Sequence, residues 1–114
     1  MANVHASWVR VLNGATTEVP GPPGTAHVVP VFDLTTADRL TDFTSSGTSG
    51  LIQSGGSDFE APSRGFLLIH SDGDVNIAAA DAPTASATAG IFLQAGLTLT
   101  LPVMKGDKIA VVDA

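Results

Sequence analysis

The residues of this chain that could do chemistry gather in one stretch, HSDGDVNIAAADAPTASATAG, which spans residues 70–90. His70, Asp72, Asp74 and Asp81 follow one another there at short spacing. Imidazole and carboxylate groups are side chains that commonly bind metal ions or transfer protons. The stretch therefore has two interpretations: a metal or acid–base site, or the turn of a structural β-hairpin.

The spacing favours the hairpin. A helix-loop-helix calcium site needs oxygen ligands at alternating positions that close with a bidentate Glu, and no Glu follows this stretch. Asp72-Gly73 is instead one of the strongest short hairpin signals, so we expect residues 65–71 and 74–80 to form paired antiparallel strands. In the second strand, alternation directs Val75, Ile77 and Ala79 towards the core and Asp74, Asn76 and Ala78 away from it.

The remaining residues do not form the motifs of a zinc site, a serine hydrolase, a phosphate loop or a glycosidase. His5, His27 and His70 lack the paired spacing of a zinc site, and the chain has no Cys. No GxSxG motif occurs, and the run GTSGLIQSGG is not followed by the Lys-Ser/Thr pair of a phosphate loop. The two Glu and nine Asp fall mostly in predicted turns. We therefore expect no catalytic residue, no metal, no cofactor and no enzymatic activity.

Composition narrows the class of protein further. The 114 residues suit a single domain over 1–114, with 44% hydrophobic but only 14% charged residues. So few charges suggest that partners cover part of the surface. The net charge of −6, with five scattered Lys and Arg, argues against nucleic-acid binding. No basic start with an apolar run opens the chain, and no apolar segment approaches the ~20 residues of a membrane span, so we expect neither export nor a membrane partner.

The pattern of the C-terminal half predicts an all-β fold. In LTLTLPV, residues 97–103, Leu and Val alternate with Thr and Pro, which indicates a half-buried strand with Pro102 at an edge or strand end. Gly106-Asp107 then marks a turn before a last strand in KIAVV. We expect a small antiparallel β-sandwich or jelly-roll-like barrel of about seven or eight short strands with a loop-rich middle.

The N-terminal half has weaker signals. SWVRVLN and AHVVPVFDL, residues 7–13 and 26–34, are predicted strands separated by Asn13-Gly14 and the stiff loop PGPPG. TTADRLTDF, residues 35–43, is compatible with one or two helical turns. The following segment to residue 63 is predicted as loop with a short strand at 51–53.

The aromatic residues divide into core and candidate interface. Phe66 and Phe92 lie within strand patterns and are expected in the core. Phe43 and Phe59 lie in the loop-rich middle, where an aromatic either anchors a partner or plugs the open end of a sandwich. The same alternatives apply to the N-terminal segment, of which residues 1–7 are a possible arm. The predicted partner interface is Val4, Trp8, Phe43 and Phe59.

The last third to two fifths of the chain, GDVNIAAADAPTASATAGIFLQAGLTLTLPVMKGDKIAVVDA, resembles the closing part of small virion proteins of tailed bacteriophages. The resemblance consists of a Val-x-Ile-Ala strand, a PTAS loop, an apolar strand that ends in Ala-Gly, an alternating strand and a G-x-K-I-A-V strand. In this chain these elements are residues 75–78, 83–86, 91–96, 97–103 and 106–111.

The resemblance implies a capsid decoration or cement protein, a small β-sandwich on the outside of the head. It further implies that the major capsid protein is the partner, that the chain forms a homo-oligomer with a trimer favoured, and that a protein made in the host cytoplasm ends on the virion surface. The alternatives are another virion component of the tail or head fibre, and a carbohydrate-binding sandwich. The single Trp and the absence of Tyr disfavour the latter, because sugar sites usually stack on exposed aromatic rings.

Overall fold

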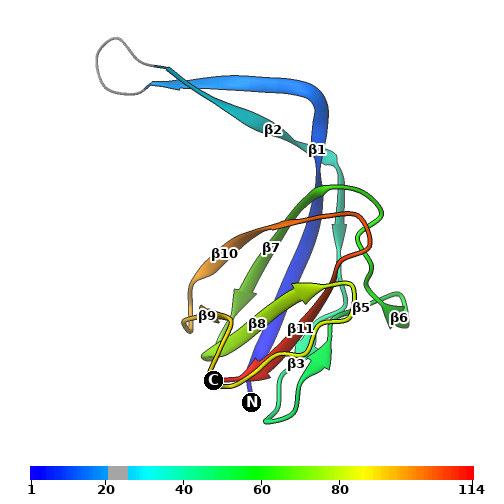
Figure 1. Ribbon diagram of the computed structural model, residues 1–114, viewed down its shortest axis with the longest axis vertical. Helices are drawn as coiled ribbons and strands as arrows, with labels where there is room; N and C mark the ends of the chain where they lie inside the picture. Colours follow the sequence, from blue (N-terminus) through cyan, green and yellow to red (C-terminus); the bar gives the residue numbers. More distant parts are fainter. Residues whose placement is uncertain (21–25) are drawn as a thin grey trace.

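A computed structural model describes the backbone of residues 1–20 and 26–114 and the side chains of residues 1–10 and 37–114. The protein is all-β, as the sequence predicts, and the described backbone contains no helix. Two antiparallel sheets lie face to face, and a long two-stranded ribbon extends beyond them (Figure 1).

The first sheet contains the N-terminal strand at its centre. Its order is β10 (Thr98–Val103), β7 (Gly65–Ser71), β1 (Asn3–Pro20) and β2 (Ala26–Arg39), with β3 (Phe43–Thr44) also paired to β1. Residues 1–7, a possible arm in the sequence interpretation, are therefore placed differently. Val4 to Arg10 pair with Ser71 to Gly65 of β7, so this segment is a central strand with partners on both sides.

The second sheet is formed by the C-terminal half. Its order is β4 (Gly50–Leu51), β11 (Lys108–Asp113), β8 (Val75–Ala80) and β9 (Ile91–Leu93). A separate hairpin joins β5 (Gln53–Ser54) to β6 (Ser57–Asp58). Its two loop residues, Gly55 and Gly56, both have positive φ, the backbone conformation that a tight two-residue turn requires.

The core lies between the two sheets and follows the two-residue period of the strands. Along β7, Gly65, Leu67, Ile69 and Ser71 are buried, and the residues between them are half-buried. Side chains from both sheets meet in one cluster. Its largest fully buried members are Val4, Ile52, Leu67, Ile69, Val75, Ile77, Val103, Ile109 and Val111.

The hairpin predicted at Asp72-Gly73 is wrong, although the predicted core face of its second strand is confirmed. β7 and β8 belong to different sheets, so this turn carries the chain from one sheet to the other. Val75 and Ile77 are buried, and Ala79 packs against the core.

The opposite face of β8 is less exposed than alternation predicts. Asn76, expected to face solvent, is only 6% exposed. Ala78 packs against a small second cluster with Ala85, Ala110 and Val112. Ala85 belongs to the loop 81–90, so a loop covers part of this outer face.

The alternating strand and its edge position are confirmed with one exception. Leu101 and Val103 are buried, Leu99 packs against the core, and Thr98, Thr100 and Pro102 are exposed on an edge strand. Leu97 is 54% exposed because β10 begins one residue later and Leu97 belongs to the preceding turn.

The helical turns predicted within residues 35–43 are not formed. β2 continues to Arg39, where Ser7 and Trp8 pair with Arg39 and Asp38. Sheet pairing with β1 thus overrides the local preference of this segment. The described chain contains eleven strands, more than the seven or eight predicted, because β3 to β6 are only two residues long.

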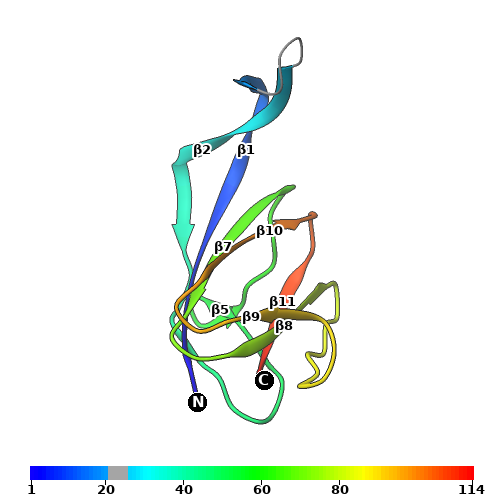
Figure 2. The ribbon, with the colours of Figure 1, turned by 90° about the vertical axis from the view of Figure 1, so that its left-hand side faces the viewer.

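The element that extends beyond the sandwich is a β-hairpin. The pairing of β1 with β7 ends at Arg10 and Gly65, whereas the pairing of β1 with β2 continues to Pro20 and Ala26. We call residues 11–20 of β1 and 26–32 of β2 the arm. Figures 1 and 2 show the arm projecting from one end of the sandwich, with both chain termini at the opposite end.

Candidate functional site

The arm is the first candidate for a functional element. Ten residues of extended β1 span roughly 33 Å. Over this length, within the backbone that the structure describes, each strand of the ribbon pairs with the other strand alone. An isolated two-stranded hairpin is only marginally stable in water. The arm is therefore suited to lie against a surface outside the sandwich.

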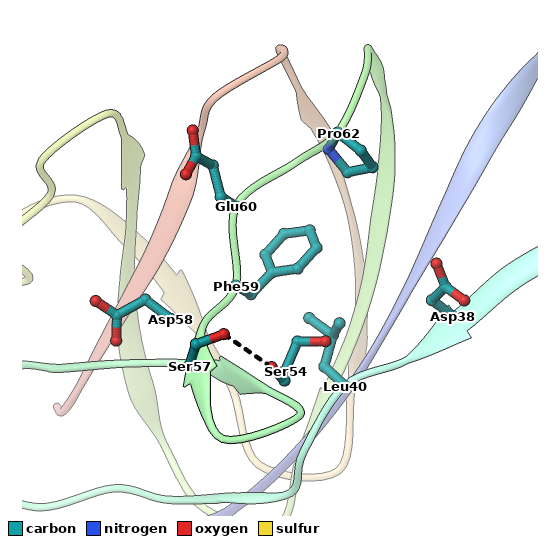
Figure 3. A pocket seen from close by; sticks show the side chains of 8 residues that line it. All are labelled: Asp38, Leu40, Ser54, Ser57, Asp58, Phe59, Glu60 and Pro62. Atoms are coloured by element: carbon teal, nitrogen blue, oxygen red, sulfur yellow. Dashed lines mark hydrogen bonds between the residues drawn. The ribbon is translucent and has the colours of Figure 1, made fainter.

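A pocket lies within the sandwich, beside the last residues of β2. It has a volume of about 270 Å³ and is bounded by β2, the β5–β6 hairpin and the segment that follows (Figure 3). Its lining residues are Asp38, Leu40, Ser54, Ser57, Asp58, Phe59, Glu60 and Pro62.

The pocket has carboxylate side chains at its rim and apolar side chains at its bottom. Leu40 and Phe59 are buried, whereas Asp38, Asp58 and Glu60 are exposed. Gln53 Nε2 donates to Asp58 Oδ1 over 2.5 Å, and Ser57 Oγ donates to the carbonyl of Ser54 over 3.3 Å. Such a lining suits a Lys or Arg side chain, because the carboxylates bind the cationic head and the floor accepts the aliphatic stem.

A His–Asp pair that the sequence did not reveal lies on the outer face of the first sheet. Nδ1 of His5 lies 2.9 Å from Oδ1 of Asp42, and Arg39 Nη2 donates to the same oxygen over 3.1 Å. The hydrogen bond from His5, followed by that from Arg39, lowers the pKa of Asp42 below 3.8. The cross-strand neighbour of His5 on β7 is His70.

The residues of the stretch 70–90 do not converge. His70 lies on β7, with Nδ1 3.5 Å from the hydroxyl of Thr98. Asp72 accepts hydrogen bonds from the backbone N–H and side-chain amide of Asn3 at 2.7 and 3.2 Å, and Asp74 accepts one from the N–H of Ala95 at 2.9 Å. Asp81 is exposed. Two of these carboxylates thus fasten separate chain segments together.

No group of three or more His, Cys, Asp or Glu is placed to hold a metal ion within the part of the chain that the structure describes. The side chain of His27 and the PGPPG segment lie outside this part. Among the described residues, no helix is long and apolar enough to cross a membrane.

The four residues predicted to form a partner interface are placed inside the sandwich. Val4, Trp8 and Phe59 are 1%, 4% and 5% exposed and belong to the core cluster. Phe43 is half-buried against the same cluster, close to Gly50. Side chains covered by their own chain leave little surface for a partner, so a candidate interface has to be sought in the arm, the pocket and the exposed residues.

The two ends of the chain are joined by a polar cluster below the sandwich. Ser45 is fully buried; its hydroxyl accepts from the N–H of Ala2 at 2.8 Å and donates to Asp113. The terminal amine of Met1 lies 3.3 Å from Oδ2 of Asp113. The hydrogen bond from Ser45, and after it the contact with the amine, lowers the pKa of Asp113. This cluster fixes the start of β1 against the end of β11.

Comparisons of the chain with protein-family models, with curated proteins and with solved structures found no match.

Proposed function

We propose that the protein is a capsid decoration or cement protein of a tailed bacteriophage. In this function it binds the major capsid protein on the outer surface of the head and stabilises the shell by burying surface between capsid subunits. The observation that carries the proposal is the two-stranded arm, which extends from a sandwich that already has its own core. The resemblance of residues 73–114 to small virion proteins supports the same function.

The arm and the pocket have complementary tasks in this proposal. The arm contains apolar residues in both strands, among them Val11, Leu12, Val28, Val29 and Phe32. A capsid surface that covers the ribbon would therefore lie against a segment rich in apolar residues. The acidic pocket beside the end of β2 receives a Lys or Arg of the shell, which fixes the orientation of the sandwich on the shell.

The proposal favours binding over catalysis. Asp72 and Asp74, in the stretch 70–90, accept hydrogen bonds from backbone and amide N–H groups. The cross-strand neighbour of His5, in the His–Asp pair, is another histidine. The one Trp, which a carbohydrate-binding sandwich would expose for stacking, is buried at the base of the arm.

The test is sedimentation of the protein with capsids stripped of their decoration. The wild type should bind saturably at micromolar concentration, and binding should depend only mildly on salt because few charges contribute. A variant in which Asn-Gly replaces residues 12–31 joins the paired residues Val11 and Phe32 by a two-residue turn and deletes the arm. We expect this variant to fold and to lose capsid binding.

The buried Trp8 provides the folding control, because its fluorescence reports the core beside the deletion. A folded wild type that does not bind capsids would contradict the proposed function. Equal binding by the folded arm-deleted variant would contradict the role of the arm.

A further inference from the structure

Two histidines lie opposite each other on the outer face of the first sheet. The antiparallel register places His5 of β1 directly across from His70 of β7. Both belong to the face away from the core, because the residues on either side of each along the chain are buried. The side chain of His5 is 43% exposed and His70 is half-buried, so both rings are accessible from solvent.

This placement suits two imidazole rings that share one ion. Directly opposed side chains of an antiparallel pair have Cβ atoms about 4.5–5.5 Å apart. Two imidazole nitrogens on one zinc-sized ion lie roughly 3 Å apart, because each metal–nitrogen bond is about 2.0–2.1 Å long. Rings that rise from opposed positions can therefore converge on a single ion while the backbone stays as it is.

Each ring has a polar partner for its Nδ1 atom on the far side of its own strand. Nδ1 of His5 lies 2.9 Å from Oδ1 of Asp42, in the segment between β2 and β3. Both of these strands pair with β1 on the side away from β7. Nδ1 of His70 lies 3.5 Å from the hydroxyl of Thr98 on β10, which pairs with β7 on the side away from β1.

These partners leave the other nitrogen of each ring available. The two nitrogens of an imidazole are directed to roughly opposite sides, so outward Nδ1 atoms turn the Nε2 atoms of His5 and His70 towards each other. A carboxylate only accepts, so the proton of neutral His5 lies on Nδ1 and the lone pair on Nε2 is free. A histidine whose second nitrogen donates to a carboxylate is the usual form of a metal ligand.

We infer that His5 and His70 form a bidentate site for a divalent transition-metal ion that prefers imidazole, the class that contains Zn²⁺, Ni²⁺ and Cu²⁺. Asp42 positions His5, and it also pairs with Arg39, whose Nη2 donates to it over 3.1 Å. Water completes the coordination, since no group of three His, Cys, Asp or Glu is formed among the described residues. Spacing along the chain predicts no zinc site; strand pairing brings these two ligands together.

The inference goes beyond capsid binding and is tested without capsids, by isothermal titration calorimetry with Ni²⁺ in neutral buffer. We expect one ion per chain with a Kd below about 1 mM. The Tm should rise with Ni²⁺ concentration, because only the folded chain brings the two rings together. His5→Gln and His70→Gln each remove one ligand and should weaken binding at least about tenfold. Trp8 fluorescence confirms that each variant is folded.

The matched control is His27→Gln. It removes the third histidine of the chain, which belongs to the arm, and should change the affinity for Ni²⁺ less than about twofold. Mg²⁺ is the control ion, because it prefers oxygen ligands. It should neither raise the Tm nor displace Ni²⁺.

The absence of saturable Ni²⁺ binding, or an unchanged affinity in His5→Gln or His70→Gln, would overturn the inference. Loss of binding in His27→Gln, or displacement of Ni²⁺ by Mg²⁺, would place the ion elsewhere on the chain and overturn it as well. A protein that binds Ni²⁺ through this pair but ignores capsids would leave the inference standing and refute only the proposed function.

Discussion

At the scale of single residues, the base of the arm depends on the absence of a side chain at Gly65. A Cβ there would collide with the carbonyl oxygen of Val9 and lie 3.0 Å from Nε1 of Trp8. That indole nitrogen is buried without a hydrogen-bond partner, so the site already has an unsatisfied donor. The close packing of β1 against β7 at this point therefore leaves the N–H group of Trp8 without a hydrogen-bond acceptor.

We expect Gly65→Ala to lower the free energy of unfolding by about 1–3 kcal/mol, because backbone and a packed indole must move. Gly47→Ala is the control. Nothing lies within 4 Å of a Cβ at Gly47, and its φ is not positive, so stability should change by less than about 0.5 kcal/mol. Urea unfolding followed by Trp8 fluorescence measures both; equal values would disprove the steric explanation.

Two carboxylates link stability to acid pH. The pKa of Asp113 is lowered chiefly by the hydrogen bond from Ser45, and that of Asp42 chiefly by the hydrogen bond from His5. A lowered pKa in the folded state stabilises the protein above the unfolded value, near 3.8, and this contribution disappears as the pH falls through the lowered value.

The free energy of unfolding should therefore decline below about pH 4. Ser45→Ala removes the main cause of the Asp113 shift and should reduce the steepness of this decline. The measurement is urea unfolding from about pH 2.5 to 7, within the range over which Asp ionises. Parallel profiles for the wild type and Ser45→Ala would show that the Ser45 bond does not couple to the ionisation of Asp113.

At the scale of elements, β7 follows the alternation of buried and exposed side chains that is expected of a strand, and β8 departs from it. β7 buries every second residue between the sheets, whereas β8 is also partly covered on its outer face by the loop that contains Ala85. The period therefore identifies the core face reliably and the solvent face less reliably. A loop can cover an outer face without leaving any mark in the strand itself.

Two neighbouring leucines on β7 test which face of the strand belongs to the core, because the same substitution can be made on each face. Leu67 is fully buried and Leu68 is half-buried on the outer face. Leu67→Ala should cost about 2–5 kcal/mol and Leu68→Ala less than half of that, because only the first substitution leaves a cavity in the core. Denaturant midpoints and m values provide the comparison, and similar losses would mean that the two faces are not distinct.

At the scale of the whole molecule, several of the strands that pair are distant in sequence. β1 lies between β2 and β7, and β11 lies between β4 and β8. Connections at 72–74, 94–97 and 104–107 each carry the chain from one sheet to the other. Each sheet therefore combines a pair of consecutive strands with strands from remote segments, and it is complete only when those segments meet.

Refolding should consequently be slow for a chain of this size, on the millisecond-to-second scale typical of folds dominated by non-local pairing. Stopped-flow fluorescence of Trp8 after dilution from urea measures the rate. The arm-deleted variant should refold at a similar rate, because the arm pairs only with itself. Microsecond refolding would indicate that local contacts dominate.

Much of the fold and little of the candidate site could be predicted from the sequence. Alternation in residues 75–80 and 98–103 identified the core residues, because side-chain direction in a strand is a local property with period two. The pairing of His5 with His70 could not be predicted, because it depends on the register of two strands that are distant in sequence.

The tertiary structure alone decided which strands pair and which apolar residues remain outside. Asp72-Gly73 marks a reversal of the chain, but a hairpin and a crossing between sheets both reverse it, and long-range packing selects between them. Trp8 and Phe59 became core residues, and Phe92 became a surface residue, for the same reason. Burial is determined by the elements that pack against a residue, and those elements come from distant parts of the chain.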